Sequence, residues 1–282
     1  MPARALALII PQAPAHDAAL VRVSEQAAEF RLTVTLLDGR KVERRLAVTV
    51  HGDELWAREP TPEHLPAYCP ERHINSDASF CLGWSGHESK SVIDDSSATL
   101  WWGKVIQFFR LQERATRLRR WPDRHTWAHG AAAPFQRIAE ISAAKLGETF
   151  ATALQWGRLT VSEPIGRSAS NGPAITLSLD ERRLLRVWCD HPRLVNMRQP
   201  CVCDHRVGRP AIAMRGCHDH AQAAVDLVRA LVHWRTEERS FWNSLSGQAC
   251  CGTLDECPLK VAADAPQRQD SATPQDLERR AA

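Results

Sequence analysis

A cysteine in the segment from residue 66 to residue 84 has the clearest capacity for chemistry. Cys81 stands in Phe80-Cys81-Leu82, and His73 and Asn75 precede it by a few positions. A cysteine thiolate is a nucleophile that can accept an acyl group and release it again. We therefore predict that Cys81 is a catalytic nucleophile. The competing interpretation is that Cys81 is a small buried apolar residue, as free cysteines commonly are.

A second set of candidate residues lies in the last third of the chain. All of the nine cysteines except Cys69 and Cys81 follow residue 188, with histidines between them. Thiolate and imidazole groups are the ligands of tetrahedral zinc sites, so we predict a structural zinc site and no organic cofactor. The candidate metal ligands are Cys201, Cys203, Cys217, Cys250, Cys251 and Cys257.

The spacing of these cysteines does not define which of them share an ion, or whether the interspersed His191, His205, His218 and His220 take part. A set of reduced, buried thiols is the simpler alternative to zinc. A redox pair at Cys250-Cys251 is less favoured, because adjacent cysteines form strained disulfides.

The elements that would position Cys81 begin with a β-hairpin. Apolar residues alternate from Phe30 to Val50 and are interrupted by Asp38-Gly39, which is typical of two antiparallel strands joined by a tight turn. A third strand is expected to begin at residues 55–56, and residues 20–28 are a weak helix candidate. The first 60 residues therefore predict an antiparallel meander with one buried face.

The apolar period changes from two to three or four after residue 90. This change predicts a helix that begins behind Asp94-Asp95-Ser96-Ser97, a second helix over 134–156 that Gly157 closes, and a long helix over 219–245. Short strands are expected on either side of the Gly-, Ser- and Pro-rich residues 157–173. Trp84, Trp101 and Trp102 are expected to pack in the core rather than to contact a partner.

Length and composition favour two domains in one chain. The 282 residues, 44% of them hydrophobic, are enough for two cores. We predict an α+β fold in which an antiparallel meander with flanking helices is followed by a smaller, mainly helical cysteine-rich domain. The predicted limits are 1–157, 158–262 and a disordered tail, 263–282.

Charge and apolar runs argue against several classes of partner. A formal net charge of +3 gives no reason to expect nucleic acid or a membrane surface as partner. The apolar run of residues 5–10 is too short for a secretory signal, and no run approaches a membrane span. We expect a soluble cytoplasmic protein, where thiols stay reduced.

The order of these features resembles the ubiquitin-conjugating enzymes. In that family a meander is followed by His-Pro-Asn and then by an apolar residue, the catalytic cysteine and a leucine. His73, Asn75 and the Phe80-Cys81-Leu82 triplet match this motif, whereas Ile74 replaces the proline and the interval between Asn75 and Cys81 is short. The resemblance implies the UBC-like fold over roughly residues 15–156.

Three further features resemble the bacterial conjugating-enzyme-like proteins. These are the Cys-Leu-Gly-Trp sequence that ends at Trp84, the segment from Trp121-Pro122 to His129-Gly130, and the cysteine-rich extension. Such proteins are encoded beside ubiquitin-like proteins, activating enzymes and deubiquitinase-like peptidases, in settings linked to mobile elements or antiviral defence.

The resemblance implies a transferase that carries a ubiquitin-like modifier as a thioester on Cys81. The partners would be the ubiquitin-like protein, the activating enzyme and a target protein. Asn75 would donate to the oxyanion of the tetrahedral intermediate, or hold the loop that does, and His73 would support the loop rather than take protons. The nearest groups that could assist an incoming nucleophile are Asp77, His87, Asp94 and Asp95, of which the last two are better explained as helix caps.

Two other functions are compatible with the sequence. The same fold could serve as a non-catalytic adaptor that binds a ubiquitin-like protein. A papain-like cysteine protease, with Cys81 and His125 or His129, would explain a cysteine followed by a tryptophan. The order of elements disfavours it, because that nucleophile begins a helix. The arginines from Arg110 to Arg124 are most simply a solvated helix face, or a surface for an acidic partner.

Overall fold

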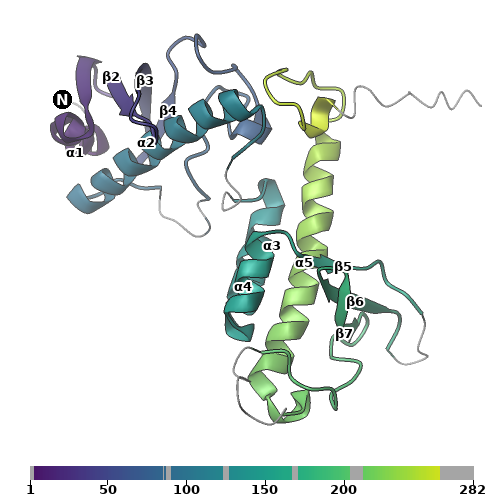
Figure 1. Ribbon diagram of the computed structural model, residues 1–282. Helices are drawn as coiled ribbons and strands as arrows, with labels where there is room; N and C mark the ends of the chain where they lie inside the picture. The colour runs from purple at the N-terminus through teal and green to yellow at the C-terminus, as the bar shows by residue number, and fades with distance from the viewer. Residues whose placement is uncertain are drawn as a thin grey trace, which may run out of the picture.

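The computed structural model of the protein describes residues 3–84, 86, 90–122, 127–166, 171–203 and 212–260. The N-terminal half is a four-stranded antiparallel sheet with helices on one side (Figure 1). Its strands follow one another in chain order: β1 (Ala18–Val23), β2 (Ala27–Thr35), β3 (Lys41–His51) and β4 (Glu54–Arg58). The predicted meander is therefore confirmed.

Two expectations about this sheet had different outcomes. The hairpin at residues 30–50 is the β2–β3 pair, which turns at Gly39 with a φ of 82°. Residues 20–28 were expected to be helical, and this was wrong, because they belong to β1 and the start of β2, paired from Ala18–Leu32 to Val23–Ala28. The first helix is instead α1 (Arg4–Gln12), formed by the short apolar run near the N-terminus.

The first core lies between the sheet, α1 and the long helix α2 (Asp95–Leu118). Trp102 is fully buried, donates its indole N–H to the carbonyl of Ile9 at 3.0 Å, and meets Phe30 edge-on. Trp101 is also buried, so both residues are core residues as expected. Asp94 accepts a hydrogen bond from the backbone N–H of Ser97 at 2.7 Å, which confirms its prediction as a helix cap.

The second core lies between three helices and a small sheet. Its helices are α3 (Ala133–Leu146), α4 (Glu148–Gln155) and α5 (His218–Ser244), and its strands are β5 (Leu159–Val161), β6 (Ala174–Leu179) and β7 (Arg182–Trp188). The single helix expected over 134–156 is interrupted at Gly147, which has a φ of 121°. The predicted long helix is α5.

Helices α3 and α4 pack in the second core although they were assigned to the first domain. Ala139, Leu146 and Phe150 lie in one cluster with Leu177 and Val228. This packing favours grouping α3 and α4 with the cysteine-rich part, and the limit at residue 157 stays a prediction. None of the described helices is long and apolar enough to cross a membrane.

Candidate functional site

The loop that follows β4 folds back on itself and brings His73 beside Cys81. Cys69 and Ile74 exchange two backbone hydrogen bonds, of 3.1 and 3.0 Å, across the short turn Pro70–Arg72. A second turn closes with Asn75 N–H donating to the carbonyl of Ser79 at 2.8 Å. The backbone N–H of Cys81 then donates to the carbonyl of His73 at 2.8 Å. The short interval between Asn75 and Cys81 is thus spanned by one tight turn.

Buried apolar side chains anchor this loop to the first core. Ile74 is 1% exposed, and Phe80 stacks on Phe108 of α2 with ring centroids 4.3 Å apart. The backbone N–H of Phe80 donates to the carbonyl of Ala57 in β4. Ile74 stands where the resembled motif has proline, and its backbone N–H donates to the carbonyl of Cys69 at 3.0 Å, a bond that proline could not make.

Cys81 lies between two cavities at the surface of the loop. The larger, of about 700 Å³, is lined by Asn75, Cys81, Leu82, Asp94 and Lys104, among others. The smaller, of about 470 Å³, is lined by His73, Cys81, Trp121 and Trp127, among others. The Cys81 side chain is half-buried, so its sulfur lies beside space that a substrate can enter.

Asn75 and Asp77 are joined through one hydroxyl group. The amide of Asn75 donates to Oγ of Ser79 at 3.0 Å, and that hydroxyl donates to the carboxylate of Asp77 at 2.6 Å. Burial raises the pKa of Asp77, but the hydrogen bonds from Ser79 outweigh it and lower the pKa overall. Asp77 is thus a charged acceptor that holds the turn. The bond to Ser79 uses one of the two N–H groups of the Asn75 amide.

His73 is enclosed by aromatic rings. It is 7% exposed and lies 5.1 Å from the ring of Trp121 and 5.2 Å from that of His129. Burial, with the charge of His129 as a lesser cause, lowers the pKa of His73 to about 3. The ring is therefore neutral at physiological pH, which favours the loop-supporting role predicted for it over a role as base.

His129 connects this loop to α5. Its Nδ1 lies 2.6 Å from a carboxylate oxygen of Glu238, its Nε2 lies 3.2 Å from the carbonyl of Pro70, and its ring stacks on Phe241. Burial lowers the pKa of His129, but the hydrogen bond and charge of Glu238 outweigh it and raise the pKa overall. Both ring nitrogens face acceptors, a carboxylate and a backbone carbonyl, so neither is available as a base, which argues against a Cys81–His129 protease pair. His125 and His87 lie outside the described residues.

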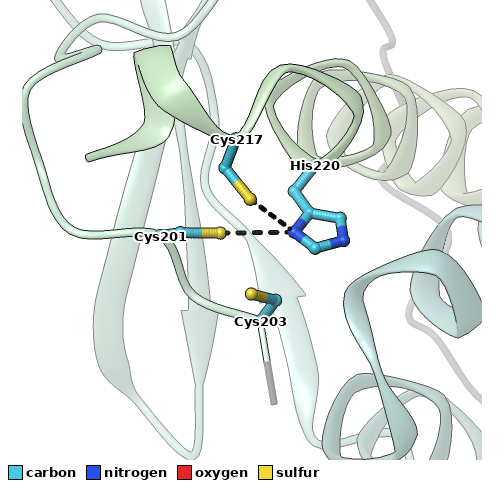
Figure 2. A group of neighbouring side chains, drawn as sticks. All are labelled: Cys201, Cys203, Cys217 and His220. Carbon is cyan, nitrogen blue, oxygen red and sulfur yellow. Dashed lines mark hydrogen bonds between the residues drawn. The ribbon is translucent and has the colours of Figure 1, made fainter. Parts of the chain in front are cut away.

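Three of the six predicted metal ligands, which lie at or before the start of α5, come together. Cys201, Cys203 and Cys217 meet His220, and the four ligand atoms all lie within 4.8 Å of one another (Figure 2). The Sγ atoms of Cys201 and Cys217 lie 3.5 and 2.9 Å from Nδ1 of His220. We name these four residues the Cys201 group. Three thiolates and one imidazole are a common ligand set for structural zinc, so the donor atoms fit that ion.

The backbone explains how the Cys201 group forms. Cys217 caps α5 and His220 lies in its first turn, so the two side chains, three residues apart, share one face of the helix. Cys201 is fixed against them by a hydrogen bond from its N–H to the carbonyl of Ile212 at 2.8 Å. His220 was not among the predicted ligands, although its spacing from Cys217 is the signal that could have indicated it.

The other predicted ligands lie at the opposite end of α5. Cys250, Cys251 and Cys257 pack in a third cluster with Cys69, beyond the C-terminus of the helix. Since α5 has 27 residues, its ends are about 40 Å apart. The six predicted cysteines therefore cannot share one site.

An antiparallel meander, a loop that turns His73 and Asn75 back onto a cysteine, and a long helix packed on the sheet together define a domain of the ubiquitin-conjugating, or E2, type. Family models agree with this class. The model "Prokaryotic E2 domain" matches residues 16–123, and the model "Cysteine-rich domain, C-terminal to E2 domain" matches residues 128–259. The chain therefore belongs to the prokaryotic E2-like proteins that carry a cysteine-rich domain after the E2 domain.

This membership confirms the resemblance drawn from the sequence. It supports a role of the ubiquitin-conjugation type and implies interaction with ubiquitin-like proteins and activating enzymes in general. No match was found among curated proteins or among solved structures.

Proposed function

We propose that the protein carries a ubiquitin-like modifier as a thioester on Cys81 and transfers it from an activating enzyme to a target. The observation that supports this most directly is the position of the Cys81 side chain, half-buried between two cavities on a loop that also carries Asn75. The N–H of Phe80 donates to the carbonyl of Ala57 and that of Cys81 to the carbonyl of His73, so the backbone that carries the sulfur is held in place.

The proposed reaction has two acyl-transfer steps. The Cys81 thiolate attacks the carbonyl carbon of the modifier's thioester on the activating enzyme, a new C–S bond forms, and the enzyme's thiolate leaves. An amine or hydroxyl of the target then attacks the same carbon, the Cys81 thiolate leaves, and the nucleophile's proton passes to solvent. The second step, in which the less reactive amine or hydroxyl attacks, is the one that needs an amide N–H to stabilise its tetrahedral oxyanion.

Asn75 is the proposed donor to that oxyanion. It lines the 700 Å³ cavity with Cys81, and its amide keeps one N–H beyond the bond to Ser79. Loss of a single such donor typically slows transfer by about 10² to 10³. His73 is proposed to support the loop through its backbone carbonyl, which accepts from Cys81.

Purified protein, cognate activating enzyme, modifier and ATP provide the test. We expect an adduct that thiols cleave, that Cys81→Ala abolishes, and that Cys81→Ser converts to a thiol-resistant ester. Cys189→Ser, a half-buried cysteine in the second core, is the matched control and should load normally. Formation of the same thiol-sensitive adduct by Cys81→Ala would exclude Cys81 as the carrier. If the protein binds the modifier but forms no adduct with it, the result would support the non-catalytic adaptor instead.

Asn75→Ala separates the two steps. We expect it to load at a near-normal level and to lose the adduct slowly when an amine is added. Equal discharge rates for this variant and the wild type would remove Asn75 from the mechanism.

A further inference from the structure

A second group of thiols lies where the E2 domain meets the end of the chain. It consists of Cys69, Cys250, Cys251 and Cys257, which we name the Cys69 quartet. The sulfurs of Cys69 and Cys251 are 3.0 Å apart, and those of Cys250 and Cys257 form a second hydrogen-bonded pair. Cys69 and Cys257 are buried and the other two are half-buried, so the group is enclosed but open to solvent on one side.

Polar groups of residues 252 and 253 point at two of the four sulfurs. The N–H of Gly252 donates to Sγ of Cys250 at 3.4 Å, and the hydroxyl of Thr253 lies 3.0 Å from Sγ of Cys251. The N–H groups of Arg72 and Lys260 donate to the carbonyls of Cys69 and Cys257. Hydrogen bonds to sulfur stabilise it when it carries negative charge, and they are the usual outer partners of metal-bound thiolates.

A buried positive charge lies beside the quartet without a carboxylate in contact. Arg72 is 1% exposed and donates to Gln112 and Thr116, all of them neutral acceptors. In the described part of the chain, no ion pair joins Arg72 to an Asp or Glu side chain. The negative charges that act on it are those of the Cys69 and Cys251 sulfurs and, to a smaller extent, that of Glu113, which is paired with Arg44. A buried guanidinium is costly unless negative charge compensates it, and the quartet is the larger source of that charge.

We propose that the Cys69 quartet binds a second Zn²⁺ ion, separate from that of the Cys201 group. On binding, the thiols release their protons to solvent and four Zn–S bonds of about 2.3 Å form. The centre then carries two negative charges, one of which Arg72 balances. Unlike the Cys201 group, no three of these sulfurs all lie within 4.8 Å of one another. Side-chain rotation would have to bring the Cys250–Cys257 pair to the Cys69–Cys251 pair around the ion.

The consequence of this site is a link between the active-site loop and the C-terminal segment. Cys69 begins a turn that ends at Ile74, and the two residues form a β-bridge. Ile74 lies between His73 and Asn75. The ion would hold that turn against residues 250–257. The ion pair between Arg119 and Asp255, at 2.8 Å, already links the same two parts of the chain. The effect on conjugation rests on the function proposed above, whereas metal binding does not.

Metal content of the full-length protein tests the proposal. After purification under reducing conditions, mass spectrometry of the metal should find two zinc ions per chain. Cys69→Ser and Cys250→Ser should each retain only the zinc ion of the Cys201 group, and Cys217→Ser should retain only that of the Cys69 quartet. Cys189→Ser should retain both ions. Replacement by Co²⁺ should give the absorption of a tetrahedral four-thiolate site in Cys217→Ser but not in Cys69→Ser.

Several results would overturn the proposal. One zinc in the wild type that Cys217→Ser abolishes, two zinc ions in Cys69→Ser, or iron in place of zinc would each do so. A Cys69–Cys251 disulfide in protein purified under reducing conditions would also exclude it. Cys250 is half-buried, so Cys250→Ser provides the measurement if Cys69→Ser does not fold. Two zinc ions with no adduct on Cys81 would leave the metal site standing and remove only the proposed function.

Discussion

Glu71 and His73 lie on one turn and are expected to cancel each other's effect on the pH dependence of stability. Burial raises the pKa of Glu71 to about 7, with nearby Glu238 and Glu256 adding to it and His129 opposing. Burial lowers the pKa of His73 to about 3. The unperturbed values are 4.5 and 6.5. Between pH 4.5 and pH 6.5, Glu71 is protonated in the folded state and loses its proton on unfolding. His73 is neutral in the folded state and gains a proton on unfolding.

The two contributions have opposite signs. Stability falls with rising pH where the folded state binds the extra proton, as at Glu71, and rises where the unfolded state does, as at His73. Each contributes up to about 1.4 kcal/mol per pH unit, so the sum is near zero in the wild type. Glu71→Gln imitates the protonated carboxyl and leaves the His73 term alone. Between pH 4.5 and pH 6.5 the unfolding free energy of the variant should therefore rise by about 2 to 3 kcal/mol more than that of the wild type.

Urea unfolding followed by tryptophan fluorescence, in half-unit steps of pH, measures this difference directly. His73→Asn is the opposite control, since asparagine tolerates the left-handed backbone of residue 73, where φ is 56°. Its stability should fall with pH over the same range. If Glu71→Gln follows the wild-type curve in parallel, Glu71 is not held protonated by burial and the reasoning is refuted.

Two further substitutions test the supports of the loop and of α2. Asp94→Ala should lower the unfolding free energy by about 1 kcal/mol, since it removes the cap of α2, while Ser96→Ala on the exposed first turn should change little; an equal loss in both variants would contradict the capping role. Arg72→Met should cost about 1 to 3 kcal/mol because it leaves the buried side-chain oxygen of Gln112 without its donor. Gln112 also donates to the backbone carbonyl of residue 72 at 2.7 Å, so Gln112→Leu should cost less in the Arg72→Met background than in the wild type in the same urea assay, and a purely additive double variant would argue against the pairing.

Local patterns carried most of the information that the sequence held about the fold. The alternation from Phe30 to Val50 and the capping sequence before α2 depend on neighbours in the chain, and both were predicted. Strand β1 was not, because Leu20, Val21 and Val23 lie outside the core, and only pairing with β2 makes them a strand. An edge strand with an exposed apolar face has no period that a single segment reveals.

The sites show the same division between local and distant information. Cys81 was predicted from a short motif, and the turn at Asn75 spans the short interval between Asn75 and Cys81. The engagement of His129 by Glu238 joins residues 109 positions apart, and no spacing in the sequence indicates it. Cys69 was passed over as a ligand for the same reason, because its thiol neighbours follow it by some 180 positions.

The position of α5 has a consequence for where the E2 unit ends. Glu238, Phe241 and Trp242 of α5 surround His129, which in turn covers His73. A fragment cut at the limit of the E2 match, residue 123, would keep Cys81 but lose this covering and would open the ring of His73 to water. The cysteine-rich domain thus supplies one wall of the loop that carries Cys81, and a piece with that wall intact extends through the whole of α5.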